Sequence, residues 1–238
     1  MSRPAPRPPL RGLAPGVPAV LAPRSFARLR ALLFAVALLP LARLVWLGAG
    51  DGLGANPVEF VIRSLGTWAL VGLIVTLSVT PLRLATGWAW LARLRRMFGL
   101  FAFFYALLHF LAWLWLDQWF DAAAIAADIA KRPYIAIGFA TLLLLVPLAL
   151  TSTDASVRRL GGRNWQRLHR LVYVIAPLAV LHFWWQKAAK NDLGEPLLYA
   201  LAVGLLLGVR LLRALRRRYG SLDSRANSDS TVSRRRTS

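Results

Sequence analysis

The sequence contains six apolar runs, each about as long as a helix that crosses a lipid bilayer. Because the hydrocarbon core is about 30 Å thick, such a helix needs roughly 20 mostly apolar residues. We therefore predict an all-α, polytopic membrane protein built as a bundle of six transmembrane helices. The approximate limits of the predicted helices are 28–47, 58–80, 97–116, 133–151, 170–187 and 196–213. The breaks between them are short and rich in turn-forming residues, so we expect successive helices to be antiparallel neighbours.

Composition excludes a water-soluble enzyme and narrows the choice of partners. Hydrophobic residues make up 57% of the chain, and the formal net charge is +20. Such a positive excess suits either nucleic acid or anionic lipid, and the apolar content decides for anionic lipid and against nucleic acid. The sequence has no cysteine. Disulfides, iron–sulfur clusters and thiol catalysis are therefore excluded.

Arginine is concentrated on the side of the predicted bundle that carries both termini. The N-terminal segment with the start of the first helix holds six arginines, the second loop four, and the fourth loop with the start of the fifth helix five. Because positive residues of short loops stay in the cytoplasm, we predict that both termini are cytoplasmic. Residues 1–27, rich in Pro and Arg, and 214–238, rich in Ser and Arg, are predicted to be disordered basic tails. Residues 28–213 are the predicted membrane domain.

Two histidines are predicted to lie at the same depth inside the membrane. His109 follows Arg96 by 13 residues, and His182 follows Arg170 by 12. At 1.5 Å per residue, both imidazoles lie about 18–20 Å from the inner boundary, in the outer half of the bilayer. A b-type haem takes axial nitrogens from both sides of a flat ring, so this pair predicts one haem, with aromatic residues such as Tyr105 beside it. The alternative is a transporter or membrane scaffold in which the histidines only hydrogen-bond neighbouring helices.

The third histidine and two outer arginines leave several interpretations open. His169 precedes His182 by 13 residues, a distance of about 19.5 Å along a helix that suits a second haem. The two residues do not share a face of a straight helix, although Pro177 between them could introduce a kink. An inner haem, a quinone or flavin contact and a structural role for His169 all remain possible. Arg43 and Arg63 either extend to the interface or bind an anionic group such as a propionate or a quinone head group.

Six short motifs occur in an order that resembles the MsrQ (YedZ) family. They are TPLR at 80–83, LRR at 94–96, FFYALLH at 103–109, KRPY at 131–134, LTST at 150–153 and NWQRLHRLVY at 164–173. The resemblance covers roughly residues 48–213. It implies a ferric-reductase-like six-helix domain in the bacterial inner membrane, with haem b bound by histidines matching His109, His169 and His182. It also implies an electron-transfer subunit without substrate chemistry of its own, which carries electrons from the quinone pool to MsrP, a periplasmic molybdopterin reductase of methionine sulfoxide.

The resemblance also implies FMN, for which the sequence itself contains no phosphate-binding motif. The arginine-rich side offers Arg95, Arg96, Arg167 and Arg170 as candidates to bind its phosphate, but the same residues would suit anionic lipid equally well. Only about 25 residues follow the sixth predicted helix, too few for a nicotinamide-binding domain. We therefore expect the electrons to come from quinol or from a separate flavoprotein. A stand-alone quinol or ferric reductase is the alternative function.

Overall fold

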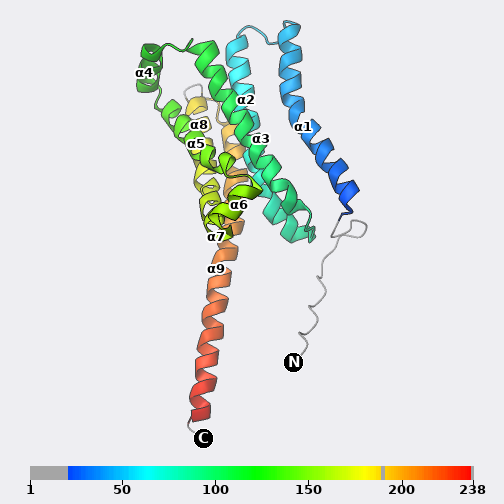
Figure 1. The fold of residues 1–238 in the computed structure, drawn as a ribbon. Helices are drawn as coiled ribbons and strands as arrows, with labels where there is room; N and C mark the ends of the chain where they lie inside the picture. The colour runs from blue at the N-terminus through cyan, green and yellow to red at the C-terminus, as the bar shows by residue number, and fades with distance from the viewer. Residues whose placement is uncertain (1–20, 189–190, 237–238) are drawn as a thin grey trace.

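Six long apolar helices form the body of the protein in the computed structural model, which describes residues 21–188 and 191–236, and side chains only up to Arg216 (Figure 1). Within these residues, six helical segments are long and apolar enough to cross a membrane. Their main helices are α1 (Pro23–Ala49), α2 (Pro57–Thr86), α3 (Leu91–Ala112), α5 (Pro133–Leu150), α8 (Val172–Ala188) and α9 (Gly194–Arg236). The predicted fold is confirmed, and the protein is a multi-pass membrane protein.

The ends of these helices follow from local sequence. Proline stands at the start of α1, α2 and α5, where its missing N–H group is not needed by the helix. Asn56 caps α2, since its side chain accepts a hydrogen bond from the backbone N–H of Glu59 at 3.2 Å. At the other end of α2, Gly87 adopts a left-handed conformation with φ of 76°. Glycine reaches this conformation without steric cost, so the helix ends there.

Short helical segments occupy parts of the chain that we predicted as loops. They are α4 (Ala122–Lys131), α6 (Asp154–Leu160) and α7 (Gly162–His169). The third predicted helix, 97–116, is observed as α3 followed by a π-helical turn over Trp113–Asp117. A turn at residues 170–171 separates α7 from α8. His169 and His182 therefore lie on different helices, although we compared them along one helix.

Helix α2 continues through Pro81, although we predicted the second helix to end before it. Proline has no N–H group, so the carbonyl of Leu77, four residues earlier, loses its usual helical partner. Arg210 of α9 replaces that partner by donating a hydrogen bond from its guanidinium group to the Leu77 carbonyl oxygen. The same side chain also donates to the carbonyl oxygen of Leu206 at 3.2 Å. The helix thus tolerates an internal proline because a neighbouring helix supplies the missing donor.

Helix α9 reaches Arg236 and projects from the arrangement of the other helices (Figure 1). Its backbone therefore extends past the predicted end of the sixth helix at residue 213, into the segment predicted as a disordered tail. That segment begins with Ala, Leu and Arg, which are good helix formers. Residues 1–20 of the predicted N-terminal tail lie outside the described residues, and its last residues belong to α1. The division into one membrane domain and two tails stays a prediction.

Two apolar clusters hold the helices together. The first lies between α2, α3, α5, α8 and α9 and contains the fully buried Leu77 and Ile175. The second joins α1, α2 and α3 around residues such as Leu65. Helices α2 and α3 approach closely at Gly72, where an added Cβ would lie 3.0 Å from the Cα of Ala102. Small residues at such a contact let membrane helices pack backbone against backbone.

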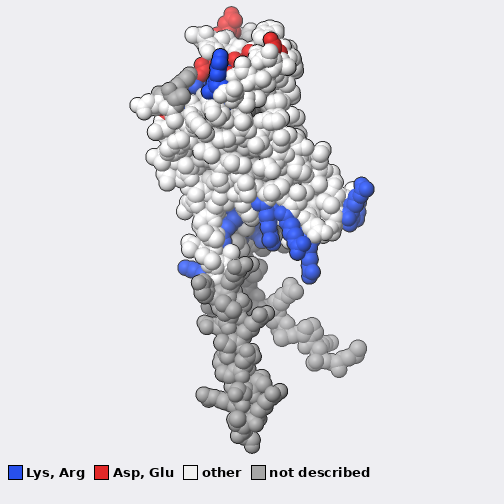
Figure 2. Space-filling model, turned by 90° about the vertical axis from the view of Figure 1, so that its left-hand side faces the viewer, with Lys and Arg blue, Asp and Glu red and all other residues white. Residues whose placement is uncertain are grey.

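On the face that Figure 2 shows, charged side chains gather at two opposite ends of the bundle and leave a band without Lys, Arg, Asp or Glu between them. The acidic end comprises the loops and helix ends that carry Asp51, Glu59, Asp117, Asp121, Asp128, Asp192 and Glu195. The arginine-rich end comprises those that carry Arg83, Arg93, Arg95, Arg96, Arg158, Arg159, Arg163, Arg167 and Arg170. A band without charges is what contact with lipid chains requires, because charged groups are costly there.

Candidate functional site

A cavity of about 1320 Å³ lies between α2, α3, α5 and α8 and extends toward the acidic end. Most of its lining is apolar or aromatic, and it includes both histidines that the sequence placed at equal depth. The aromatic and large aliphatic lining residues include Leu70, Phe110, Trp113, Phe139, Leu142 and Phe183. A mainly apolar cavity that also presents polar groups is the usual form of a cofactor site.

Each of the two histidines is oriented by a backbone carbonyl of a neighbouring helix. The Nδ1 atom of His109 on α3 lies 2.8 Å from the carbonyl oxygen of Ile62 on α2. The Nδ1 atom of His182 on α8 lies 2.7 Å from the carbonyl oxygen of Tyr134 on α5. A carbonyl oxygen can only accept, so each Nδ1 carries the proton and donates it. In the neutral ring, the Nε2 atom then keeps a free lone pair.

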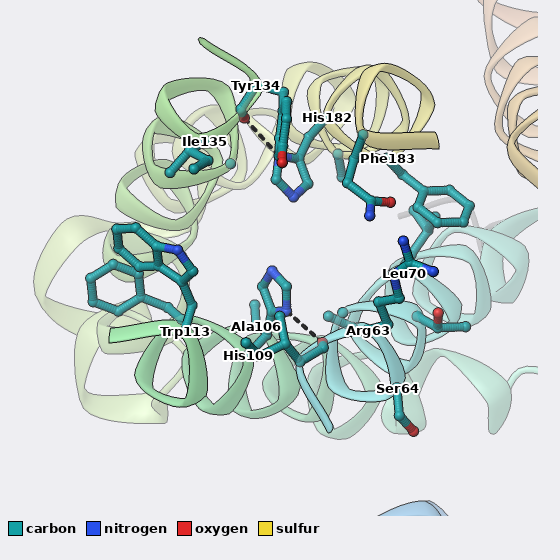
Figure 3. Close-up of a pocket in the computed structure, with 18 of the residues that line it drawn as sticks. Arg63, Ser64, Leu70, Ala106, His109, Trp113, Tyr134, Ile135, His182 and Phe183 are labelled. Atoms are coloured by element: carbon teal, nitrogen blue, oxygen red, sulfur yellow. Dashed lines mark hydrogen bonds between the residues drawn. The ribbon is translucent and has the colours of Figure 1, made fainter. Parts of the chain in front are cut away.

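His109 and His182 face each other across the cavity (Figure 3). Their ring centroids are 6.1 Å apart and their planes meet at 76°. Their Nε2 atoms point toward each other from opposite walls (Figure 3). Two metal–imidazole bonds of about 2 Å each would place opposed ring centroids about 6 Å apart. The spacing therefore fits one metal ion held between the two rings.

The space beside the two rings suits a flat macrocycle. Ala106 and Ala179 each lie three residues before one of the histidines and line the cavity with it. Residues three apart on a helix share a face, so the small methyl groups leave room next to each imidazole. Haem is such a flat ring, and it supplies the four remaining nitrogen ligands of its iron itself. The residues present thus fit a haem with two axial imidazoles.

Two buried N–H donors at the edges of the cavity have no hydrogen-bond partner among the described residues. They are Nε of Arg63 and Nε1 of Trp113, which lie on opposite sides of the cavity (Figure 3). Arg63 also forms an ion pair with Glu59, at 2.6 Å from its Nη2. A buried donor without a partner is costly, and an acceptor on a bound group would satisfy it. Arg63 thus points into the cavity, which favours the interpretation that it binds an anionic group.

His169 lies at the arginine-rich end, apart from the pair. Its ring stacks on that of Trp165 with centroids 3.8 Å apart, and its Nδ1 lies 3.0 Å from the Trp165 carbonyl oxygen. Its Nε2 lies 3.5 Å from the hydroxyl oxygen of Ser152, just beyond α5. The imidazole is therefore held by its own helix and by the end of α5, and the structure does not bring it to His109 or His182.

The four arginines predicted to bind a cofactor phosphate lie around the arginine-rich end in different settings. Arg96 forms an ion pair with Asp154 at 2.6 Å, which links α3 to α6 and lowers the pKa of that carboxyl group. Arg95 is half-buried and lies within electrostatic range of His169. Arg167 and Arg170 are exposed, on α7 and directly after it. The structure thus brings Arg95 toward His169 and engages Arg96 with a carboxylate.

Sequence reasoning missed Arg210, which lies near the same end. Its guanidinium carbon is 5.6 Å from the ring centroid of Tyr173, and Arg95 lies within its electrostatic range. The signal was present in the sequence, because Arg210 is a charged residue inside the sixth apolar run. Charged residues inside a membrane helix usually have a partner within the protein.

Tyr105, which we predicted to lie beside the macrocycle, is placed elsewhere. Its hydroxyl group donates a hydrogen bond to the carbonyl oxygen of Ala37 on α1 at 2.7 Å, and its ring belongs to the cluster that joins α1 to α2 and α3. The cavity is lined by Ala106 and not by Tyr105. Around the helix axis, Tyr105 lies about 40° to one side of His109, and Ala106 lies about 60° to the other side. One therefore faces α1 and the other faces the cavity.

Comparison with known proteins assigns the chain to a family. The family model described as "Ferric reductase like transmembrane component" matches residues 65–180. The chain is 57% identical to a protein of Bordetella pertussis over 84% of this chain and 97% of that relative. It is 56% identical to proteins of Ralstonia nicotianae and Rhodospirillum rubrum, over 82% and 79% of this chain and 90% of each relative. All three bear the name protein-methionine-sulfoxide reductase heme-binding subunit MsrQ. With identity this high over most of its length, the chain belongs to the MsrQ family.

Proposed function

We propose that this protein passes respiratory-chain electrons from the quinone pool to a periplasmic molybdopterin methionine sulfoxide reductase of the MsrP type. It would do so through haem b in the bacterial inner membrane. The observation that carries this proposal is the opposed pair of His109 and His182, with ring centroids 6.1 Å apart in an apolar cavity. The names of the relatives add haem binding and a methionine sulfoxide reductase system. The protein then conducts electrons, and the chemistry at sulfur belongs to its partner.

In this proposal, His109 and His182 hold the haem through their Nε2 atoms. When bound, the haem supplies one-electron transfer in a medium of low dielectric constant. The carbonyl groups of Ile62 and Tyr134 keep each ring in the tautomer that leaves Nε2 free for the metal. Arg63, at the edge of the cavity, offers its guanidinium group to a propionate carboxylate of the haem.

The two charged ends support an orientation in the membrane. Because arginine stays in the cytoplasm, we place the arginine-rich end there and the acidic end in the periplasm. The cavity extends toward the acidic end, so this orientation brings the site close to a periplasmic acceptor. The segments 117–132 and 187–195, of which residues 189–190 lie outside the described part of the chain, then form the docking surface for the reductase. At the opposite end, the arginines would meet anionic lipid head groups.

We place the binding site of the electron donor at the arginine-rich end. His169, Arg95 and Arg210 lie near one another there, and Arg167 and Arg170 are exposed beside them. A quinol, a second haem or the phosphate group of FMN would find positive charge at this place. For FMN, the support is the family resemblance together with this charge.

The experiment is a spectrum of the purified protein, followed by reconstitution with its partner. We expect a Soret band and sharp dithionite-reduced bands of b-type haem, and extraction of the cofactors identifies haem b and FMN. A quinol-reduced sample should then be reoxidised by an MsrP-type reductase only when methionine sulfoxide is present. Reoxidation without any partner would support a stand-alone reductase instead. Colourless protein after expression in haem-replete cells would contradict the proposal.

A further inference from the structure

Each histidine of the opposed pair packs against a glycine of the neighbouring helix. A Cβ atom added to Gly66 on α2 would lie 3.0 Å from Nδ1 and 3.1 Å from Cε1 of His109. A Cβ atom added to Gly138 on α5 would lie 2.7 Å from both Nδ1 and Cε1 of His182. A side chain at position 138 would therefore collide with the His182 ring, and one at position 66 would press on the His109 ring, which would have to shift by a few tenths of an ångström.

Both glycines have the same position relative to the carbonyl group that orients the ring. Gly66 follows Ile62 by four residues, and Gly138 follows Tyr134 by four. In an α-helix, the carbonyl of a residue accepts the N–H of the residue four positions later. The Cβ atom of that later residue tilts back toward the start of the helix and lies over the carbonyl. A glycine thus uncovers the carbonyl oxygen, whose second lone pair accepts the imidazole Nδ1–H.

The arrangement occurs twice, on two different helix pairs. Gly66 lies at the contact between α2 and α3, and Gly138 lies at the contact between α5 and α8. Glycines elsewhere in the described helices have other surroundings. A Cβ atom on Gly99 would lie at an ordinary distance of 3.8 Å from Thr76, and one on Gly208 would have nothing within 4 Å. The close contact with an imidazole ring is therefore a feature of the site and not of membrane glycines in general.

We propose that Gly66 and Gly138 are positioning residues for the two axial imidazoles. They let each ring donate its Nδ1–H to a helix carbonyl, which sets the rotation of the ring and makes its Nε2 a stronger donor to a metal. The inference rests on the proposed function, since it concerns the haem ligands. A stronger axial donor favours the ferric state, so a weakened Nδ1–H bond is expected to raise the reduction potential of the haem.

The test compares the variants Gly66→Ala and Gly138→Ala with the wild-type protein. For each protein, the haem-to-protein ratio, the low-spin ferric electron paramagnetic resonance spectrum and the midpoint potential are measured. For Gly138→Ala, we expect either loss of the haem or a reduced-to-oxidised ratio about tenfold higher at a fixed applied potential, which corresponds to about 59 mV for one electron. Gly66→Ala should change the potential in the same direction by less, because its added carbon lies farther from the ring.

The matched control is Gly72→Ala, in the same helix as Gly66. Its added Cβ would lie 3.0 Å from the Cα of Ala102, so it disturbs the contact between α2 and α3 without touching a histidine. We expect this control to unfold at a lower temperature but to keep the potential and the resonance spectrum of the wild type. Haem loss in Gly66→Ala and Gly138→Ala but not in Gly72→Ala supports the inference.

Two outcomes would overturn the inference. One is a wild-type spectrum and potential in both Gly66→Ala and Gly138→Ala. The other is equal haem loss in these two variants and in Gly72→Ala, since helix packing alone would then explain it. A colourless wild-type protein would instead overturn the proposed function, so the two failures are distinguishable.

Discussion

His109 and His182 donate their Nδ1 protons in opposite directions, to Ile62 on α2 and to Tyr134 on α5, and their Nε2 atoms consequently meet across one cavity (Figure 3). Four helices thus take part in orienting two side chains. Such a pair acts as a unit, because a metal bound between the rings needs both nitrogens at once.

Replacement of either histidine of the pair should remove most of the same haem. His109→Ala and His182→Ala each delete one of two axial nitrogens, so we expect the same b-type band to disappear from the reduced-minus-oxidised spectrum of both variants. His169→Ala is the control at the other end of the bundle and should change a different signal. Full haem content in either of the first two variants would contradict the pairing.

Removal of the cation at the edge of the cavity should weaken haem binding without abolishing it. A hydrogen bond to a charged group contributes about 1.5–3 kcal/mol, so we expect Arg63→Leu to raise the Kd for haem roughly 10- to 100-fold. Titration of haem into the apoprotein measures this effect. Glu59→Gln, which removes the carboxylate paired with Arg63, should leave the Kd unchanged or lower it. A parallel loss of affinity in both variants would show that the ion pair acts only through the fold.

The bond from Arg210 to the Leu77 carbonyl should matter more for stability while Pro81 is present than without it. Arg210→Met leaves a buried carbonyl without a donor, and we expect a loss of about 1–3 kcal/mol in the free energy of unfolding. In a Pro81→Ala background, the alanine N–H satisfies the same carbonyl, so the loss should shrink. A double-mutant cycle on unfolding in detergent measures this coupling. Additive effects of the two substitutions would rule out the compensation.

Tyr105 should contribute to stability and not to haem binding. Its hydroxyl group bonds to the Ala37 carbonyl in the contact between α1 and α3. We expect Tyr105→Phe to lower the free energy of unfolding by about 1 kcal/mol and to keep the haem-to-protein ratio of the wild type. Thermal unfolding and a haem assay on one preparation test both halves. Haem loss at wild-type stability would restore the role that we predicted from the sequence.

The ion pair between Arg96 and Asp154 should make the attachment of α6 to α3 dependent on pH. The arginine holds the pKa of the Asp154 carboxyl group below its usual value of 3.8. The pair therefore favours the folded state above that value, and its contribution is lost as pH falls through the lowered pKa. We expect Asp154→Asn to lower the unfolding temperature slightly at about pH 6 and hardly at all at about pH 2, since both groups are solvent-accessible. An effect equal at both pH values would contradict the electrostatic explanation.

Part of the site could be predicted from the sequence because it depends on counting along one helix. The apolar runs predicted six membrane helices, and six are observed among the described residues. The common depth of His109 and His182 came from the constant rise of 1.5 Å per residue and from arginines that mark the boundary. For His169 the count does not run along one unbroken helix, because a turn at residues 170–171 separates its helix from that of His182.

The sequence by itself determined that the chain crosses a membrane, which stretches cross it, and which two imidazoles lie at one level, because these properties follow from hydropathy and from residue number. Only the tertiary structure decided that the imidazoles face each other, that Gly66 and Gly138 make room for them, and that Tyr105 faces α1. The physical reason is that the direction of a side chain depends on the rotation of its helix against its neighbours. That rotation is set by packing between segments far apart in the chain.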